Sequence, residues 1–156
     1  MLLVQGNLAN SHQMLGRPEA LRMRRDLYSM RLKLSGEEHR DTLLQANNYA
    51  SLLKTLKRFE EAKSLMHKSI PIARRVLGES HDITLTMRRI YAIALYKDAS
   101  ATLDDHREAV TTLEDLRRTA RRVLGGAHPT TVGLEDALRY SRAALRAREA
   151  PPSRGA

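Results

Sequence analysis

Three histidines are the residues whose type and spacing first suggest chemistry in this chain of 156 residues. His39, His81 and His128 each stand three residues after a glycine, and they are 42 and 47 residues apart. Histidine is the commonest metal ligand, but the ligands of one ion must lie ~2 Å from it. Residues that recur once in each helix pair are separated by about one helix packing distance, on the order of 10 Å. We therefore predict that each of these histidines bonds to the backbone of its own turn, and that the chain holds no metal. The remaining histidines show no ligand spacing either: His12, His67 and His106.

Two pairs of adjacent carboxylates are the next residues that could act as catalytic groups. Glu60-Glu61 and Asp104-Asp105 each fall in the first turn of an expected helix, where acidic side chains stabilise the positive end of the helix dipole. The chain has no cysteine, and its sequence contains no nucleophile elbow and no glycine-rich phosphate loop. The sequence thus predicts a protein that is not an enzyme and needs no cofactor.

The formal net charge of +9 favours an anionic partner such as nucleic acid, an acidic peptide or a membrane surface. The basic residues occur mostly as separate pairs, which equally fits a solvated, arginine-rich helix exterior. Aromatic residues make up only 4% of the chain, so few rings are present for stacking on bases. No apolar run approaches the ~20 residues of a membrane span, and the predicted location is cytoplasmic.

The glycine–histidine turns divide the chain into repeats of two helices. Apolar residues at helical spacing predict helices over residues 2–15, 18–34, 41–56, 59–77, 82–97, 103–124 and 129–148. A period of this length with two helices per unit indicates a helical solenoid. We predict one all-α domain over residues 1–150, a right-handed α-solenoid of antiparallel helix pairs. Its repeats are expected at about 2–35, 36–77 and 78–124, followed by a capping helix at 129–148 and a disordered tail at 151–156.

Local signals add detail to these helices. Asp41 or Thr42 is expected near the N-cap of the third helix, and Thr102 with Asp105 has the spacing of a capping box. Two apolar stripes are expected to be buried, one in the helix at 18–34 and one in the helix at 129–148. Their residues are Ala20, Met23, Leu27, Met30 and Leu34, and Val132, Leu134, Ala137, Leu138 and Leu145.

The first predicted repeat has no glycine–histidine turn before it. A solenoid end that lacks a polar cap exposes the face that another repeat would cover. We therefore expect Leu2, Leu3 and Val4 to be partly exposed, and we predict possible self-association through this helix.

The repeated residues resemble the tetratricopeptide repeat, specifically the 42-residue kind found in kinesin light chains. The first-helix boxes are Asn7-Leu8-Ala9, Asn48-Tyr49-Ala50 and Ile90-Tyr91-Ala92. The second-helix boxes are Pro18-Glu19-Ala20, Glu60-Glu61-Ala62 and Arg107-Glu108-Ala109. Small alanines at these positions allow two helices to approach closely where they cross. The resemblance covers nearly the whole chain and implies a protein-binding scaffold or adaptor.

The resemblance also implies that the first helices line a concave groove that holds a peptide. By the repeat register, its walls are Asn10, Gln13, Asn47, Ser51, Lys54, Arg89, Tyr96 and Lys97. Asparagine can pair with both the N–H and the C=O of a peptide backbone, and the three cations would attract an acidic ligand. Kinesin-light-chain-like repeats imply a peptide with an aromatic residue among acidic ones. Solvated first-helix residues would show the same pattern, and that alternative stays open.

The function predicted from the sequence is therefore a non-catalytic module that binds an acidic peptide segment of a protein partner. Two alternatives remain. The chain could be a basic helical array that binds nucleic acid, or a fragment of a larger repeat scaffold.

Overall fold

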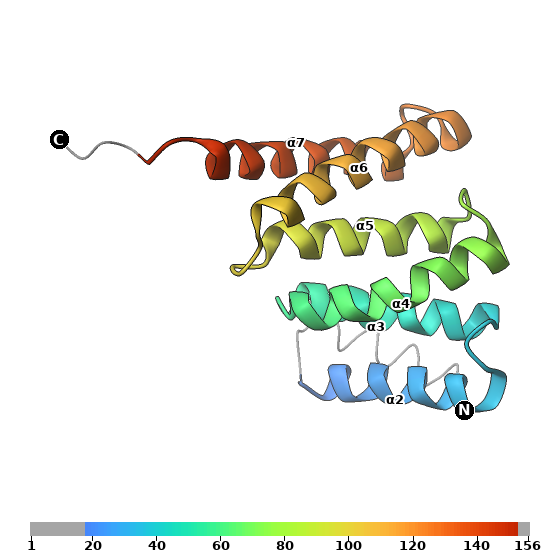
Figure 1. Ribbon diagram of the computed structural model, residues 1–156. Helices are drawn as coiled ribbons and strands as arrows, with labels where there is room; N and C mark the ends of the chain where they lie inside the picture. The colour runs from blue at the N-terminus through green and yellow to red at the C-terminus, as the bar shows by residue number, and fades with distance from the viewer. Residues whose placement is uncertain (1–17, 153–156) are drawn as a thin grey trace.

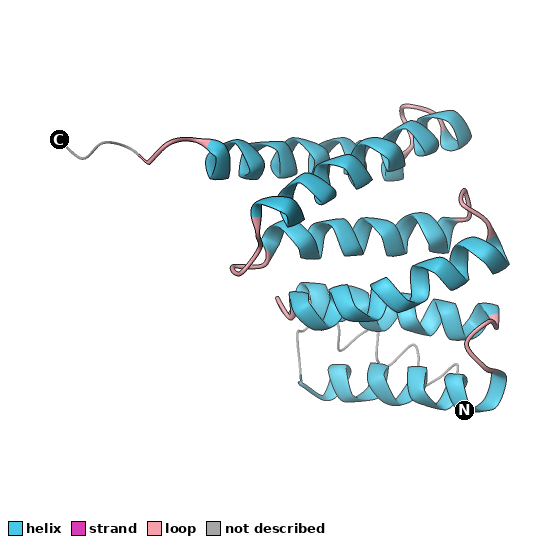
Figure 2. Cartoon of the chain, viewed as in Figure 1, coloured by secondary structure: helices cyan, strands magenta, loops and turns pink. Residues whose placement is uncertain are grey.

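The computed structural model describes residues 18–152, and this part of the chain contains six α-helices and no strand (Figure 2). They are α2 (Pro18–Ser35), α3 (Arg40–Thr55), α4 (Phe59–Leu77), α5 (Asp82–Lys97), α6 (Leu103–Leu124) and α7 (Pro129–Glu149). The bounds agree with the predicted helices to within one residue, so the prediction of an all-α helical repeat is confirmed. The predicted helix at 2–15, with its self-association, and residues 153–156 of the predicted tail lie outside the described residues.

The helices are stacked in two layers. Each described helix packs against the next one along the chain, and α5 also contacts α3 and α7. The helices α3, α5 and α7 thus form one layer. In Figure 1, α4 is drawn in front of α3 and α6 in front of α7, which makes the second layer. This arrangement of antiparallel pairs is an α-solenoid.

Alanine occupies the positions where the helices of a pair meet. Ala50 of α3 and Ala62 of α4 belong to one hydrophobic cluster, and Ala92 of α5 and Ala109 of α6 belong to the next. All four residues are fully buried. A side chain of one carbon allows the backbones to approach, as the repeat pattern predicts.

Three residues of the predicted apolar stripes are exposed instead of buried. Met30 and Leu34 of α2 are 41% and 70% exposed, because α3 is the only described helix that contacts α2 substantially and Leu34 lies in the last turn. Val132 of α7 is 47% exposed, whereas the equivalent Leu43 and Leu85 are buried. Those leucines are covered by the second helix of their own pair, and no such helix follows α7 among the described residues.

The face of α7 that would receive a second helix is also changed in sequence. Arg139 and Arg142 stand 11 and 14 residues after the turn histidine, where α3 and α5 have alanine and leucine. Arg139 pairs with Asp136 at 2.9 Å, and Arg142 pairs with Glu114 of α6 at 2.6 Å. Two long charged side chains replace the small residues that a crossing helix needs, so α7 presents a polar surface there.

The turn histidines are N-caps, as the sequence indicated. The Nδ1 atoms of His39, His81 and His128 accept the backbone N–H two residues on, at 3.1–3.2 Å. His39 is the N-cap of α3, and Asp41 and Thr42, which the sequence placed near the cap, stand two and three residues after it. Thr42 instead donates its hydroxyl to the carbonyl of Arg31 in the preceding helix, at 3.3 Å. The threonine of each turn is buried for this reason.

The predicted capping box at the start of α6 is present. The N–H of Asp105 donates to Thr102 Oγ1 at 3.1 Å, and the N–H of Thr102 donates to Asp105 Oδ2 at 2.8 Å. Replacing Thr102 with alanine is expected to lower the free energy of unfolding by about 1 kcal/mol, because a helix N–H loses its acceptor. Urea unfolding of this variant measures the loss. Thr86→Ala is the control, since Thr86 only donates back to the carbonyl of Asp82 within its own helix; an equal loss in both would contradict the capping role.

Candidate functional site

The layer of α3, α5 and α7 carries the predicted groove residues that the structure describes. Asn47, Ser51 and Lys54 follow one another at spacings of four and three on α3, so they share one face of the helix. Arg89, Tyr96 and Lys97 stand on α5, which packs beside α3. Asn10 and Gln13 lie outside the described residues.

Three cations come together across α3 and α5. Burial lowers the pKa of the Lys54 ammonium, and the positive charges of Arg89 and Lys97 lower it further. Each of these effects disfavours the charged form. Among residues 18–152, none of the three cations has a carboxylate within 4 Å. The site is therefore electropositive and its charge is uncompensated within the described structure.

Four side-chain atoms of α3, α5 and α7 are buried without a hydrogen-bond partner in the described part of the chain. Two of them belong to predicted groove residues, Oδ1 of Asn47 and Nε of Arg89, and the others are Oε1 of Gln45 and Oγ of Ser141. Asn47 and Tyr96 are each only 9% exposed, so these two residues contribute less open surface than the sequence suggested. A buried polar atom without a partner costs free energy, and native proteins rarely keep one unless something satisfies it.

The layer of α3, α5 and α7 also contains residues that the sequence reasoning missed. The Arg89 guanidinium lies against α7 at Gly133, where a side-chain carbon would be in ordinary van der Waals contact with it at 3.5 Å. Tyr140 is 59% exposed, with the Arg139 guanidinium 5.4 Å from its ring centre. Tyr140 stands 12 residues after His128, as Ser51 does after His39. The same repeat register, continued into the last helix, would have found it.

Tyr96 lies close enough to Arg89 and Tyr140 for both to affect its ionisation. Burial has the largest effect and raises the pKa of the Tyr96 phenol, the charge of Arg89 lowers this pKa, and Tyr140 raises it. Tyr96, Arg89 and Tyr140 are thus electrostatic neighbours. The aromatic surface of the groove lies toward α7 and its cations toward α3.

Other kinds of site are not found in the described structure. Residues 18–152 contain no cluster of His, Asp or Glu that could hold a metal ion. None of the described helices combines the length and apolar composition needed to cross a bilayer.

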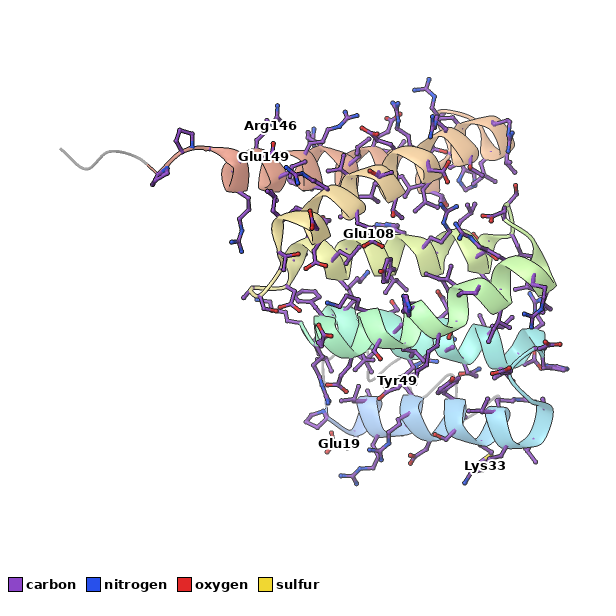
Figure 3. All side chains as sticks on the ribbon, viewed as in Figure 1. Glu19, Lys33, Tyr49, Glu108, Arg146 and Glu149 are labelled. Atoms are coloured by element: carbon purple, nitrogen blue, oxygen red, sulfur yellow. The ribbon has the colours of Figure 1, made fainter. Side chains whose placement is uncertain are left out.

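The outer surfaces carry side chains of both charge signs, spread over all the described helices (Figure 3). Arginines of α6 and α7 are joined to carboxylates of the facing helix: Arg107 to Glu149 at 3.4 Å, Arg121 to Glu135 at 3.3 Å, and Arg142 to Glu114 at 2.6 Å. The charges of these three arginines are therefore neutralised locally, unlike those of Lys54, Arg89 and Lys97.

Comparison with known protein families identifies a repeat in part of the chain. Residues 42–82 match the family model described as the tetratricopeptide repeat. The chain contains a tetratricopeptide repeat. Among curated proteins, a sequence search finds no significant match.

Solved structures share the fold of the whole described chain. One contains the nearly identical TPR-like repeats assigned to a Podosopora anserina kinesin light chain, with 21% identity and a TM-score of 0.71 over 99% of this chain and 77% of that one. A single-substitution form of those repeats gives 21% identity and a TM-score of 0.75 over 95% and 68% of the two chains. BtubC from P. vanneervenii gives 18% identity and a TM-score of 0.58 over 99% and 68%. The predicted resemblance to kinesin-light-chain-like tetratricopeptide repeats is confirmed.

Tetratricopeptide repeats are in general protein–protein interaction modules, and this fold serves as a non-catalytic scaffold.

Proposed function

We propose that the face formed by α3, α5 and α7 binds an acidic segment of a protein partner. The observation that carries the proposal is the cluster of Lys54, Arg89 and Lys97, which has no carboxylate within ion-pairing distance in the described part of the chain. A carboxylate of the partner would relieve the mutual repulsion of these charges and form charge-assisted hydrogen bonds. Electrostatic complementarity of this kind gives an interface its specificity and its association rate.

Two of the buried polar atoms supply a second element of recognition. Oδ1 of Asn47 would accept an N–H of the partner backbone, and Nε–H of Arg89 would donate to a partner oxygen. Both atoms are shielded from solvent in the unbound protein, so a partner would reach them only after these side chains rotate outward, and its hydrogen bonds would then offset the cost of leaving them unpaired.

Tyr140, which is 59% exposed, supplies the apolar part of the surface, with the largely buried Tyr96 beside it. An exposed tyrosine offers a large contact area with little side-chain entropy to lose. A segment with an aromatic residue next to acidic ones would place its ring toward α7 and its carboxylates toward α3. This is the ligand that the resemblance to kinesin light chains implies.

The test is the affinity for a synthetic peptide of glutamates around one tryptophan, measured by fluorescence anisotropy at ~150 mM salt. The double variant Lys54→Glu, Arg89→Glu is expected to bind at least about 100-fold more weakly, because two attractive charge pairs become repulsive. The matched control is Lys33→Glu, Arg122→Glu, which changes the same number of charges on exposed residues of α2 and α6. Unchanged binding in the groove variant, or an equal loss in the control, would overturn the proposal.

Nucleic-acid binding is the competing function. It is motivated by the net charge of +9, and it is disfavoured by the ion pairs that neutralise the arginines between α6 and α7. A duplex or single strand bound with a steep inverse dependence on salt would support this alternative.

A further inference from the structure

The junctions between successive helix pairs are built alike on the side of α4 and α6, away from the groove. Tyr49 of α3 stands ten residues after His39, and Tyr91 of α5 stands ten residues after His81. Each tyrosine lies beside a glutamate at the same repeat position of the following helix, Glu61 or Glu108. The two junctions therefore offer the same aromatic ring to whatever lies between neighbouring second helices.

The first junction is filled by a side chain of the protein itself. The ring of Tyr28, from α2, stacks on that of Tyr49 with the ring centres 6.3 Å apart and the planes inclined by 29°. This is the offset geometry that aromatic pairs prefer. The ring of Tyr28 is thus the natural occupant of this place in the repeat.

The second junction lacks that occupant. The residue 42 positions after Tyr28 is Ile70, which has no ring. A cleft of about 290 Å³ is present here, and the residues that line it include His67, Ile70, Pro71, Tyr91, Glu108 and Thr112. A second cleft of about 320 Å³ shares His67 and Tyr91 with it. In Figure 3, Glu108 lies between α5 and α6 at this junction.

The walls of the cleft suit an aromatic ring that carries a hydroxyl. Tyr91 donates its hydroxyl to Oε1 of Glu108 at 2.9 Å, so its ring is held in place. The imidazole of His67 lies 6.4 Å from that ring. Pro71 has no N–H, so the carbonyl of His67 has no donor from its own helix and is free to accept one.

The size of the cleft also suits one aromatic side chain. Pockets for drug-sized ligands are about 300–1,000 Å³, so this cleft lies at the lower limit and suits a single side chain. Burial and the hydrogen bond to Glu108 together raise the pKa of Tyr91 to about 12, and burial has the larger effect. Its phenol therefore stays protonated at neutral pH and keeps the Glu108 carboxylate engaged.

We propose that this cleft is a second docking site, which accepts a tyrosine side chain of a partner protein in the place that Tyr28 takes at the first junction. The partner's ring would pack against Tyr91 and beside Ile70, and its hydroxyl would donate to the His67 carbonyl. The site goes beyond the proposed groove, because it lies in the other layer and recognises a ring rather than a carboxylate.

The experiment is a titration of the full chain with N-acetyl-tyrosinamide, followed by NMR of the His67, Tyr91 and Thr112 signals. A ligand of this size is expected to bind with a dissociation constant of about 1–10 mM, and N-acetyl-alaninamide is the control probe. Saturable shifts at these three residues with the tyrosine probe alone support the proposal. No saturable shift, or shifts confined to Tyr96 and Tyr140 of the groove, would overturn it.

Two variants block the cleft from opposite walls. Ile70→Tyr introduces the residue that the first junction uses, and Thr112→Tyr fills the cleft from α6 without touching a core residue. Each is expected to weaken binding of the probe at least about 10-fold. If Ile70→Tyr does not fold, binding of the probe to Thr112→Tyr alone tests the proposal. Unweakened binding in the folded blocking variants would overturn the proposal.

A groove variant separates this site from the proposed function. Lys54→Glu, Arg89→Glu is expected to leave the tyrosine-probe shifts unchanged, because these residues do not line the cleft. Loss of the probe shifts in this variant would count against a separate site. Failure of the groove peptide to bind would leave the cleft result intact.

Discussion

Replacing Arg24 with methionine is expected to raise the free energy of unfolding by about 1–4 kcal/mol. Arg24 is 1% exposed, and its Nε and Nη2 atoms are buried with no hydrogen-bond partner among residues 18–152. Burial lowers the pKa of its guanidinium, which shows that the charged form is disfavoured there. A buried cation of this kind destabilises the fold.

The repeat itself indicates which residue belongs at this position. Met66 and Leu113 occupy the equivalent place in the following two second helices, and both are fully buried in the core. A methionine is flexible and close in length to arginine, so it can fill the same space without the charge.

Thermal and urea unfolding measure the expected stabilisation. Arg25→Met is the control, because the Arg25 side chain is 59% exposed and its replacement should change stability by less than about 0.5 kcal/mol. A loss of stability in Arg24→Met would contradict the prediction and would mean that the guanidinium is satisfied in the folded protein.

Replacing Ala109 with leucine is expected to lower the free energy of unfolding by about 1–3 kcal/mol, through overpacking. Ala109 is fully buried in the cluster that holds Ala92, where α5 and α6 meet. Three additional carbons at this point force either the helices apart or the side chain out of its preferred rotamer. Separation of α5 from α6 would also displace Tyr91 from Glu108 and so deform the cleft between them.

The matched control is Ala143→Leu, on the exposed face of α7. Leucine is a good helix former, so this change should leave stability within about 0.5 kcal/mol of the original. Circular dichroism during heating compares the two variants. Equal melting temperatures would show that α5 and α6 do not need a small residue at their contact.

The helices and their bounds could be predicted because the repeat contains its own stop and start signals. Gly36, Gly78 and Gly125 have φ angles of 79°, 97° and 89°, which a residue with a side chain adopts only with strain. Each ends a helix, and the histidine three residues later begins the next. The sequence placed Asp41 or Thr42 near the N-cap of α3, and the structure shows that the cap itself is the turn histidine, His39.

Exposure at the ends of the stack was harder to predict. Met30, Leu34 and Val132 have the spacing of buried residues. The counterparts of Val132 in α3 and α5, Leu43 and Leu85, are buried, whereas Val76, the counterpart of Leu34 in α4, is 41% exposed. Periodicity indicates which face of a helix is apolar, but burial needs a second element to cover that face. At these residues the described structure provides none.

For the candidate groove, too, the sequence predicted where residues lie but not which contacts they make. The repeat register predicted the side of α3 and α5 that carries Lys54, Arg89 and Lys97. It did not reveal that Asn47 and Tyr96 are largely buried, or that Arg89 lies against α7 at Gly133. These are contacts between different helix pairs, and they depend on side-chain sizes at positions far apart in the chain.

The sequence by itself determined the class of fold, the length of the helices and the repeat, because glycine turns, capping residues and apolar spacing act within about one helical turn of each residue. The tertiary structure decided which atoms remain without a partner and where space is left. Tyr28 of the preceding repeat stacks on Tyr49, whereas Ile70 stands at the equivalent position beside Tyr91, and a cleft remains there next to the ring of His67. Side chains from neighbouring repeats meet only when the helix pairs stack, so packing between repeats creates the surfaces on which a partner would act.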